Sequence, residues 1–347
     1  MKKIGIIGYF GAPGRCSDGQ SVKTQILADE LIKLYGSDEV LTVNTCGGIK
    51  YMLFYIYSLI KFEIICRNVF ILPAENSIRL FSPIMVMCNF LLRRKLHYVV
   101  IGGWLPEFLQ SKKWLSRVLK RFDCIYVETI TMKSKLEAKG FKNIVILPNC
   151  KDLPIVDKSQ FQKTFLPPYK FCTLSRVNKK KGIEDAISAI MAINKESGKT
   201  ICTLDIYGPI ADDYKERFTE LLKDSPNFIQ YKGVVTFDKT VDVLKDYFVL
   251  LFPTHYFTEG IPGTVLDAYA AGVPVIFSRW VNYKDLLDDG IVGIGYDFDN
   301  YEAFVNVIRD VIKDSEKITK MKYNCIQKAH AFLTKNVIKD ILVPYLK

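Results

Sequence analysis

Residues 249–277, VLLFPTHYFTEGIPGTVLDAYAAGVPVIF, contain the pattern that decides the fold. An apolar run at 249–252 predicts a buried strand, a helical pattern begins near Thr264, and a second apolar run at 274–277 predicts another strand. The turn before the helix is rich in glycine and proline and contains an acid, Glu259. A strand, a helix and a strand in this order predict two parallel strands joined by a crossover helix.

The same alternation runs through the chain in two stretches. Strands of the first stretch are predicted at 3–8, 40–44, 69–72, 98–101, 124–127 and 144–147, with a helix at 21–35. Strands of the second are predicted at 171–174, 203–207, 229–231, 249–252 and 274–277, with helices at 183–194, 212–223 and from Thr264. Short apolar strands separated by helices favour parallel sheets covered on both faces. We therefore predict an α/β fold of two Rossmann-like, doubly wound domains facing across a cleft.

A polar, proline-containing stretch from Pro148 to Pro168 separates the two halves and predicts a linker. We expect a first domain at 1–152, the linker at 153–168 and a second domain at 169–325. The last segment, 326–347, is expected to be a helix that crosses back to the first domain.

Composition limits the class of protein. The chain has 347 residues, of which 49% are hydrophobic and 24% charged, as in globular proteins. We expect no signal peptide, because the run Ile4–Phe10 is typical of a first strand. Apolar runs such as 51–60 are shorter than the roughly 20 residues that span a bilayer. The nine cysteines form no CxxC pair, which predicts reduced thiols in a reducing compartment.

The formal charge of +11 is concentrated in the first half of the chain. There, cations lie beside aromatic and aliphatic residues, in KYMLFYIYSLIK at 50–61 and FLLRRK at 90–95. This mixture predicts peripheral contact with an anionic membrane surface. The alternative is that both stretches are core helices with charged ends. No nucleic-acid-binding motif appears, so we expect no nucleic-acid partner.

Two loops at predicted strand ends could hold phosphate. The glycine-rich loop from Gly8 to Gln20 includes Gly19 and precedes a helix, where backbone N–H groups and the helix dipole favour anions. It lacks the GxGxxG fingerprint, and a plain surface loop is the alternative. In Ser175–Gly182, Arg176 and Lys181 could converge on a diphosphate, although a solvated charge run is the alternative.

Two further clusters extend this set. Gly208 ends a predicted strand where a flat base might lie, although turn formation explains it equally well. In the opening stretch, Glu259 precedes the helix, and the free N–H groups of Gly263, Thr264 and Val265 lie at its amino end. Asp267 lies inside that helix, eight positions after Glu259. Two acids on either side of an anion-binding helix end fit a nucleotide-diphosphate sugar.

Together these motifs resemble family 4 of the retaining glycosyltransferases, which have the GT-B fold. The family pattern of an acid, seven residues and a second acid corresponds to Glu259 through Asp267, followed by AYAAGVPV at 268–275. The family's Arg-x4-Lys-Gly motif corresponds to Arg176 through Gly182. GQSV at 19–22 and Pro148-Asn149 also match.

The resemblance implies a role for each position. Glu259 would contact the donor sugar, while Arg176 and Lys181 would neutralise the leaving diphosphate. The remaining donor-binding positions would be Gly19, Gln20, Gly208, Gly263, Thr264, Val265 and Asp267. No metal or cofactor is expected, because fixed cations and helix N–H groups can stabilise the leaving group.

Two departures from the family pattern affect these roles. Asp267, expected at the ribose, stands where the family usually has glutamate. The histidine that many relatives carry near the reacting carbon is missing from 99–104. We therefore expect Gly103, Trp104 and His255 on the acceptor side, with an ordinary loop position as the alternative for His255.

The resulting expectation is a metal-independent, retaining hexosyltransferase at the cytoplasmic face of the membrane. It would use a uridine diphosphate sugar, in its second domain, to extend a lipid-linked or cell-surface polysaccharide held by its basic first domain. A nucleotide-sugar 2-epimerase of the same fold is one alternative. A non-catalytic basic interaction protein is another.

Overall fold

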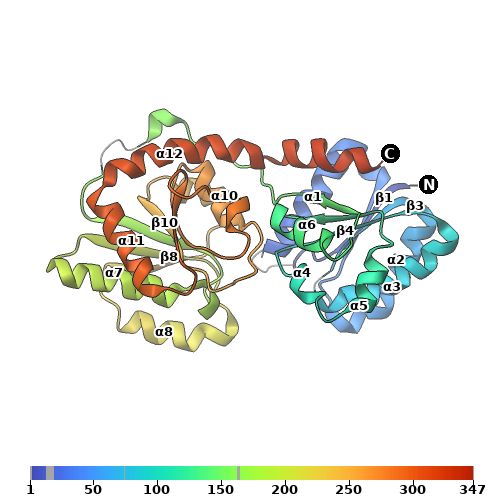
Figure 1. The fold of residues 1–347 in the computed structure, drawn as a ribbon, viewed down its shortest axis with the longest axis horizontal. Helices are drawn as coiled ribbons and strands as arrows, with labels where there is room; N and C mark the ends of the chain where they lie inside the picture. Colours follow the sequence, from blue (N-terminus) through green and yellow to red (C-terminus); the bar gives the residue numbers. More distant parts are fainter. Residues whose placement is uncertain (1, 13–18, 74, 162–164, 347) are drawn as a thin grey trace. The chain divides into compact units, whose positions relative to one another are not determined.

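The computed structural model describes residues 2–12, 19–73, 75–161 and 165–346. It contains two six-stranded parallel sheets covered by helices (Figure 1), so the predicted α/β class is confirmed. The chain divides into two compact units. The first comprises Met1–Asp152, Gly260–Pro262 and Phe332–Lys347, and the second comprises Leu153–Glu259 and Gly263–Ala331. The predicted domain boundaries stay a prediction, and residues 162–164 of the predicted linker lie outside the described residues.

The first sheet has the strand order β2-β1-β3-β4-β5-β6. Its strands are β1 (Lys2–Gly8), β2 (Val40–Asn44), β3 (Cys66–Leu72), β4 (Lys95–Val99), β5 (Cys124–Val127) and β6 (Ile144–Ile146). Its helices are α1 (Gly19–Tyr35), α2 (Met52–Ile65), α3 (Glu75–Leu92), α4 (Leu105–Phe108), α5 (Lys113–Leu119) and α6 (Ile130–Glu137). Ile6 packs in one core with α1, and its neighbour Ile7 packs in another with α2 and α3. Successive residues of a strand thus serve opposite faces of the sheet.

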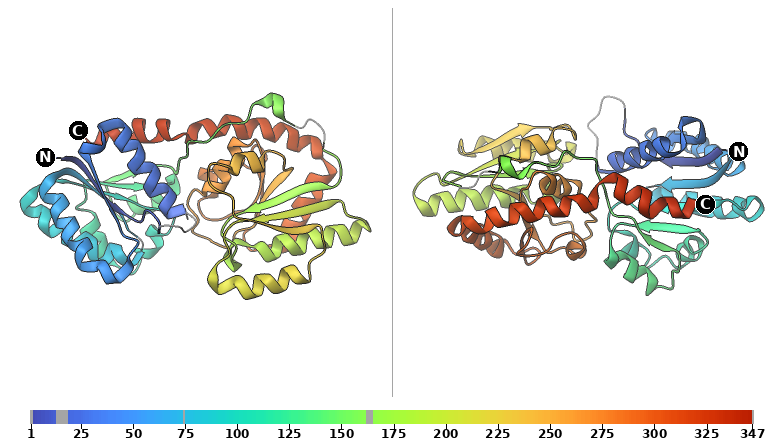
Figure 2. Two further views of the ribbon diagram at one scale, coloured as in Figure 1. Left: turned by 180° about the vertical axis from the view of Figure 1, so that it is seen from behind. Right: turned by 90° about the horizontal axis from the view of Figure 1, so that it is seen from above.

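The second sheet has the order β12-β11-β10-β7-β8-β9. Its strands are β7 (Tyr169–Leu174), β8 (Cys202–Tyr207), β9 (Ile229–Gly233), β10 (Val249–Phe252), β11 (Val275–Ser278) and β12 (Gly293–Tyr296). Its helices are α7 (Ile183–Ser197), α8 (Lys215–Lys223), α9 (Thr240–Leu244), α10 (Gly263–Ala270), α11 (Tyr301–Lys313) and α12 (Ser315–Ala329). Figure 2 shows these elements from two further sides. The strand order reverses between β7 and β10, and ligands of open α/β sheets bind at such a switch point.

Two details differ from the sequence-based predictions. The strand predicted at 98–101 is β4, which begins at Lys95 because His97 is buried and hydrogen-bonded to Asn68 and Tyr126, both at 3.1 Å. Burial lowers the pKa of His97 to about 3, so its ring is neutral. The segment 326–347 is not one helix. After α12, short helical pieces follow at His330–Phe332, Lys335–Leu342 and Val343–Leu346, and Val337, Ile338 and Leu342 are buried in the core of the first unit.

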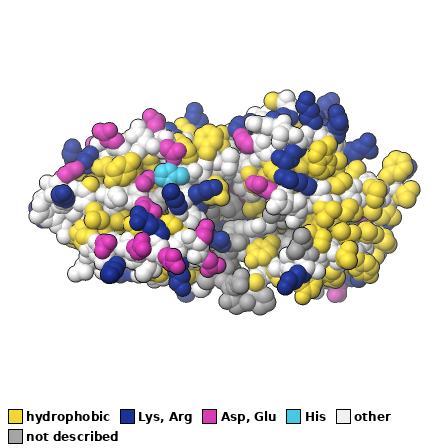
Figure 3. Space-filling model, turned by 90° about the horizontal axis from the view of Figure 1, so that it is seen from below, with side chains coloured by type: hydrophobic (Ala, Val, Ile, Leu, Met, Phe, Trp, Pro, Cys, Tyr) yellow, Lys and Arg dark blue, Asp and Glu magenta, His cyan; other side chains and the backbone are white. Residues whose placement is uncertain are grey.

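Apolar side chains also remain on the surface. Several of the most exposed belong to α2 and α3, and Figure 3 shows hydrophobic side chains gathered over the part of the molecule, at the right, that the first unit forms. Within the described ranges, no helix combines the length and the apolar character that crossing a membrane would require.

Candidate functional site

The switch point of the second sheet brings two distant loops together. β7 and β10 pair directly, with Phe171 opposite Val249, so the loops that follow them leave the same edge side by side. One loop carries Lys181 and the other carries Glu259. Their side chains form an ion pair, with exposed fractions of 18% and 14%. The two residues that the sequence assigned to diphosphate and sugar are therefore brought together.

Gly182 explains how closely the first loop can approach. It has φ +69°, and a Cβ at this position would lie 1.9 Å from the carbonyl oxygen of Pro253. Only glycine fits both conditions. A backbone hydrogen bond of 2.8 Å, from the N–H of His255 to the carbonyl of Lys180, also joins the two loops. The Lys-Gly pair of the motif thus has a physical reason, since glycine allows the approach that places the lysine.

Glu259 is held at both ends. Its carboxylate accepts a hydrogen bond of 3.2 Å from Thr254 Oγ1, besides its pairing with Lys181. Its backbone carbonyl accepts a bond of 2.6 Å from the side chain of Asn282, which is buried. The sequence analysis did not identify Thr254 or Asn282. The Phe-Pro-Thr sequence that closes β10 was a signal for Thr254, but no pattern pointed to Asn282.

The cations of the first loop differ in their surroundings. Lys181 Nζ lies 5.5 Å from the ring of Phe252 and 5.6 Å from that of Tyr256, close enough for favourable cation–π interaction. Arg176 lies near the other end of the loop and is exposed. With the exposed Lys179 and Lys180, this loop brings four positive charges to the edge that carries the carboxylate of Glu259.

Gly208 borders the same loop. It follows β8 with φ +128°, and a Cβ there would lie 1.8 Å from the carbonyl oxygen of Ser175. The bare backbone therefore packs directly on the start of the loop that carries Arg176 and Lys181. This close approach explains the glycine without any ligand, as the turn alternative anticipated.

Helix α10 begins at Gly263, so the N–H groups of Gly263, Thr264 and Val265 lie in its first turn, where they lack intrahelical acceptors. Thr264 Oγ1 is buried and has no hydrogen-bond partner among the residues that the structure describes. Asp267 lies in the same helix, and only 3% of it is exposed. The helix end thus offers unsatisfied donors, whereas Asp267 is set back in the protein.

In the first unit, Gly19 and Gln20 open α1, and Gln20 donates a bond of 3.4 Å to the carbonyl of Leu72. The part of their loop at 13–18 lies outside the described residues. A cavity of about 560 Å³ lies at the carboxyl ends of β1 and β3 in this unit. It is lined by Ile7, Gly8, Tyr9, Gln20, Thr45, Gly48, Met52, Tyr55, Leu72, Pro73, Asn76, Ser77, Leu80 and Phe81.

A buried ion pair in the first unit was not predicted. Lys23 Nζ lies 2.6 Å from Glu128 Oε1, and the two side chains are only 8% and 3% exposed. The carboxylate of Glu128 also accepts bonds from the N–H groups of Gly102, at 3.2 Å, and Ile261, at 2.8 Å. The carboxylate of Glu128 is therefore satisfied by three donors of the protein itself.

The predicted acceptor residues are already engaged. Trp104 Nε1 donates to the carbonyl of Ile101 at 2.8 Å, and Gly103 is buried. His255 lies between two carboxylates, with Nδ1 2.5 Å from Asp299 and Nε2 2.9 Å from Asp185. Burial lowers the pKa of His255, but hydrogen bonds and charge from Asp299 and Asp185 outweigh it and raise the pKa overall. The geometry favours the alternative for His255, a loop residue whose ring ties its loop to Asp299 and Asp185.

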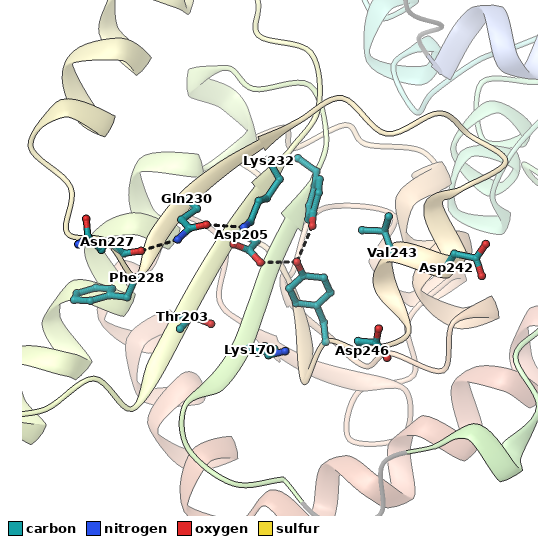
Figure 4. Close-up of a pocket in the computed structure, with 12 residues that line it drawn as sticks. Lys170, Thr203, Asp205, Asn227, Phe228, Gln230, Lys232, Asp242, Val243 and Asp246 are labelled. Carbon is teal, nitrogen blue, oxygen red and sulfur yellow. Dashed lines mark hydrogen bonds and ion pairs between the residues drawn. The ribbon is translucent and has the colours of Figure 1, made fainter.

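Another cavity, of about 430 Å³, lies in the second unit over β8 and β9 (Figure 4). Tyr247 donates to Asp205 at 2.6 Å, its hydroxyl lies 2.8 Å from that of Tyr207, and Lys232 lies 3.7 Å from Asp205. None of the predicted site residues lines it. Elsewhere too, the described part of the chain holds no group of three His, Cys, Asp or Glu side chains placed for a metal ion, and metal independence stays a prediction.

Comparisons with known proteins find glycosyltransferases. Residues 156–328 match the family model described as glycosyl transferases group 1. An uncharacterized glycosyltransferase of Methanocaldococcus jannaschii is 24% identical over 219 residues, which cover 58% of this chain and 53% of that protein. The GtfA subunit of the UDP-N-acetylglucosamine–peptide N-acetylglucosaminyltransferase of Streptococcus pneumoniae is 27% identical over 204 residues, 56% of this chain and 38% of that protein. The chain thus spans about half of the first relative and less of the second.

Among solved structures, Anabaena HepE in complex with UDP has a TM-score of 0.74 at 14% identity, over 98% of both chains. This similarity confirms the predicted GT-B fold, while membership of family 4 stays a prediction. Residues 156–328 are therefore similar to the group 1 glycosyltransferases, in a chain that has the GT-B fold from end to end.

Proposed function

We propose that this chain is a retaining glycosyltransferase that transfers a sugar from a uridine diphosphate sugar to a lipid-linked or cell-surface polysaccharide. The observation that carries the proposal is the Lys181–Glu259 ion pair at the switch point of the second sheet, beside the start of α10. Similar proteins support the donor class, since HepE was crystallised with UDP-glucose and GtfA with UDP and GlcNAc.

Donor binding would exchange partners within this pair. A diphosphate carries more negative charge than one carboxylate, so it would attract Lys181 away from Glu259. Arg176 would neutralise the remaining charge of the diphosphate. The hydroxyl groups of the sugar would then donate to Glu259 in place of the ammonium. Free N–H groups at the start of α10 would bind the diphosphate oxygens. The other proposed donor-binding residues are Gly19, Gln20, Gly208, Gly263, Thr264, Val265 and Asp267.

Catalysis would depend on stabilising the leaving nucleotide. As the bond to the anomeric carbon breaks, negative charge would develop on the diphosphate, and Arg176, Lys181 and the helix N–H groups would stabilise it. The acceptor hydroxyl would attack from the face that the nucleotide leaves, with a phosphate oxygen taking its proton, so that configuration is retained. Fixed cations would make a metal ion unnecessary.

On the acceptor side we propose Gly103 and Trp104, together with the cavity at the ends of β1 and β3. Trp104→Ala is expected to change acceptor turnover more than donor hydrolysis. The proposed setting is the cytoplasmic face of a membrane, with peripheral contact through the basic first half of the chain.

The direct test is transfer by Glu259→Gln across a panel of uridine, guanosine and adenosine diphosphate sugars. We expect the rate with the best donor to fall about 100- to 1000-fold, the usual effect of losing one site interaction of this kind. The matched control is Glu302→Gln, an exposed acid at the start of α11, which should keep its rate. Unchanged transfer by Glu259→Gln would remove Glu259 from the site.

The 2-epimerase alternative is tested in the same reaction without acceptor. A transferase leaves the donor sugar unchanged or hydrolyses it slowly, whereas an epimerase produces the C2 epimer, which NMR distinguishes. Accumulation of the epimer would replace the proposal. An interaction protein without turnover would show neither product.

A further inference from the structure

Helices α2 and α3 carry apolar side chains on the side that faces solvent. The most exposed are Leu53 on α2, at 83%, with Met87, Phe90 and Leu91 on α3, at 70%, 79% and 82%. Phe54, Tyr57 and Ile64 on α2 and Leu80 on α3 add to them. We call these eight side chains the α2–α3 face. Figure 3 shows such side chains gathered into a continuous surface on the first unit.

The opposite sides of both helices are apolar as well. Tyr55, Leu59 and Phe62 of α2 are buried in the core of the first unit, as are Phe81 and Met85 of α3. A surface helix of a globular protein normally carries one apolar stripe, and a helix that is apolar all round is normally covered on every side. The α2–α3 face therefore calls for a cover that the described residues do not supply.

The charges around the face are mostly positive. From Cys46 to Lys95 the sequence has seven lysines and arginines but only two acids, and one of these, Glu63, is buried. The exposed cations are Lys50, Lys61, Arg67, Arg79, Arg93 and Lys95. Helix α5, which packs against α3, adds the exposed side chains of Lys113, Trp114 and Arg117. An apolar centre with a cationic rim and an exposed tryptophan matches the interface of an anionic bilayer.

We infer that the α2–α3 face docks on an anionic lipid bilayer, with its apolar side chains in the acyl boundary and its cationic rim at the headgroup phosphates. The inference rests on the membrane contact of the proposed function and assigns that contact to two helices. It does not depend on the donor chemistry. The same helices contribute Met52, Asn76 and Leu80 to the cavity at the ends of β1 and β3. Docking would therefore bring that cavity close to a lipid-linked acceptor.

The test is sedimentation of the full chain with phosphatidylcholine vesicles, with and without phosphatidylglycerol, at low and high salt. We expect binding to the anionic vesicles that weakens with salt. The triple variant Leu53→Gln, Phe90→Gln, Leu91→Gln should lose about tenfold or more in partition. The control triple Ile130→Gln, Val234→Gln, Phe237→Gln replaces exposed apolar residues outside the α2–α3 face, at 61%, 47% and 59%, and should bind like the parent.

A charge variant separates the two contributions. Lys61→Gln, Arg79→Gln, Lys95→Gln should reduce binding to anionic vesicles to the level seen with neutral ones and should remove most of the salt dependence. Insertion is read from Phe90→Trp, whose fluorescence should shift to the blue with vesicles and be quenched by brominated lipid. Phe237→Trp should add neither effect to the signal of the parent chain, whose exposed Trp114 lies in the proposed interface.

Three results would overturn the inference. They are no binding of the parent chain to anionic vesicles, equal binding by the two apolar triples, and a Phe90→Trp signal that vesicles do not change. A dimer in solution that the α2–α3 triple converts to monomer, without vesicle binding, would make the face a protein interface instead. Stabilisation by UDP is measured in every variant. It should persist in the α2–α3 triple, so a failure of donor binding is distinguishable from a failure of docking.

Discussion

Two lysine–glutamate ion pairs lie at the carboxyl edges of the two sheets, and they differ in what surrounds them. Lys23 and Glu128 in the first unit are almost fully buried, and Glu128 has further N–H donors at 3.2 and 2.8 Å. Lys181 and Glu259 in the second unit are half-buried, and the one other protein donor recorded at this carboxylate in the described residues is Thr254, at 3.2 Å. The first pair is closed by the protein, and the second leaves hydrogen-bonding capacity unused.

The difference separates a structural pair from a binding pair. A buried pair is tolerated only when both charges are satisfied, so each partner depends on the other for stability. A partly exposed pair such as Lys181–Glu259 should contribute less to stability than a closed one, because water can reach either partner. It can therefore exchange partners when a charged ligand arrives. The same two residue types should thus respond in opposite ways to substitution.

The largest expected effect on stability comes from opening the closed pair. Glu128→Ala leaves the ammonium of Lys23 buried without its partner, which should cost about 3–5 kcal/mol of unfolding free energy. Glu137→Ala is the matched control, because Glu137 pairs with Lys133 at 3.7 Å on the surface and should cost less than about 1 kcal/mol. Urea denaturation measures both. Equal losses would show that burial does not distinguish the pairs.

A smaller effect is expected from Gly182, which sets the loop of the open pair. Gly182→Ala combines a positive φ with a Cβ 1.9 Å from a backbone oxygen, so the loop must move. We expect a loss of about 2–3 kcal/mol and a fall in donor affinity. Gly198→Ala is the control, since its φ is +67° and nothing lies within 4 Å of the added Cβ. It should cost about 1 kcal/mol and leave donor affinity unchanged, and similar donor affinity in both variants would contradict this account of the loop.

Glu63 provides a third case, a buried acid whose carboxylate has no hydrogen-bond partner among the described residues. Burial raises the pKa of Glu63 to about 8, so the folded state keeps a proton that the unfolded state loses near pH 4.5. Stability contributed by this residue should therefore fall as the pH rises from about 4.5 to 8, by roughly 2–3 kcal/mol at pH 7. Glu63→Gln should flatten this part of the pH profile, whereas Glu75→Gln, at an exposed acid, should not. A parent profile with no such slope would refute the assignment.

The sequence predicted that Lys181 and Glu259 belong to one site, although not that they pair, and it did not predict the Lys23–Glu128 pair. Lys181 and Glu259 each follow an apolar strand, and parallel strands place their carboxyl ends at one edge, so convergence could be argued without coordinates. The direct pairing of β7 with β10 could not be predicted from the sequence, because strand order depends on the packing of the whole domain. Lys23 lies within a helix, and no periodic pattern pointed to its pairing with Glu128.

The surface shows the same limit. The apolar runs at 50–61 and 90–95 predicted helices that either dock on a membrane or fill a core. Sequence cannot separate these, since Tyr55 is buried and Leu53, two positions earlier, is exposed. β4 begins at Lys95, three residues before the predicted start, and no sequence pattern showed that His97 is satisfied inside the core.

The central claim is that the Lys181–Glu259 pair is where the donor diphosphate binds, and calorimetric titration with UDP tests it most directly. Lys181→Met should weaken binding by about 100-fold, the size expected for one charge-assisted contact to phosphate. Lys179→Met, which removes an exposed lysine two residues away on the same loop, should bind within about twofold of the parent. UDP binding by Lys181→Met as tight as that of the parent would contradict the claim.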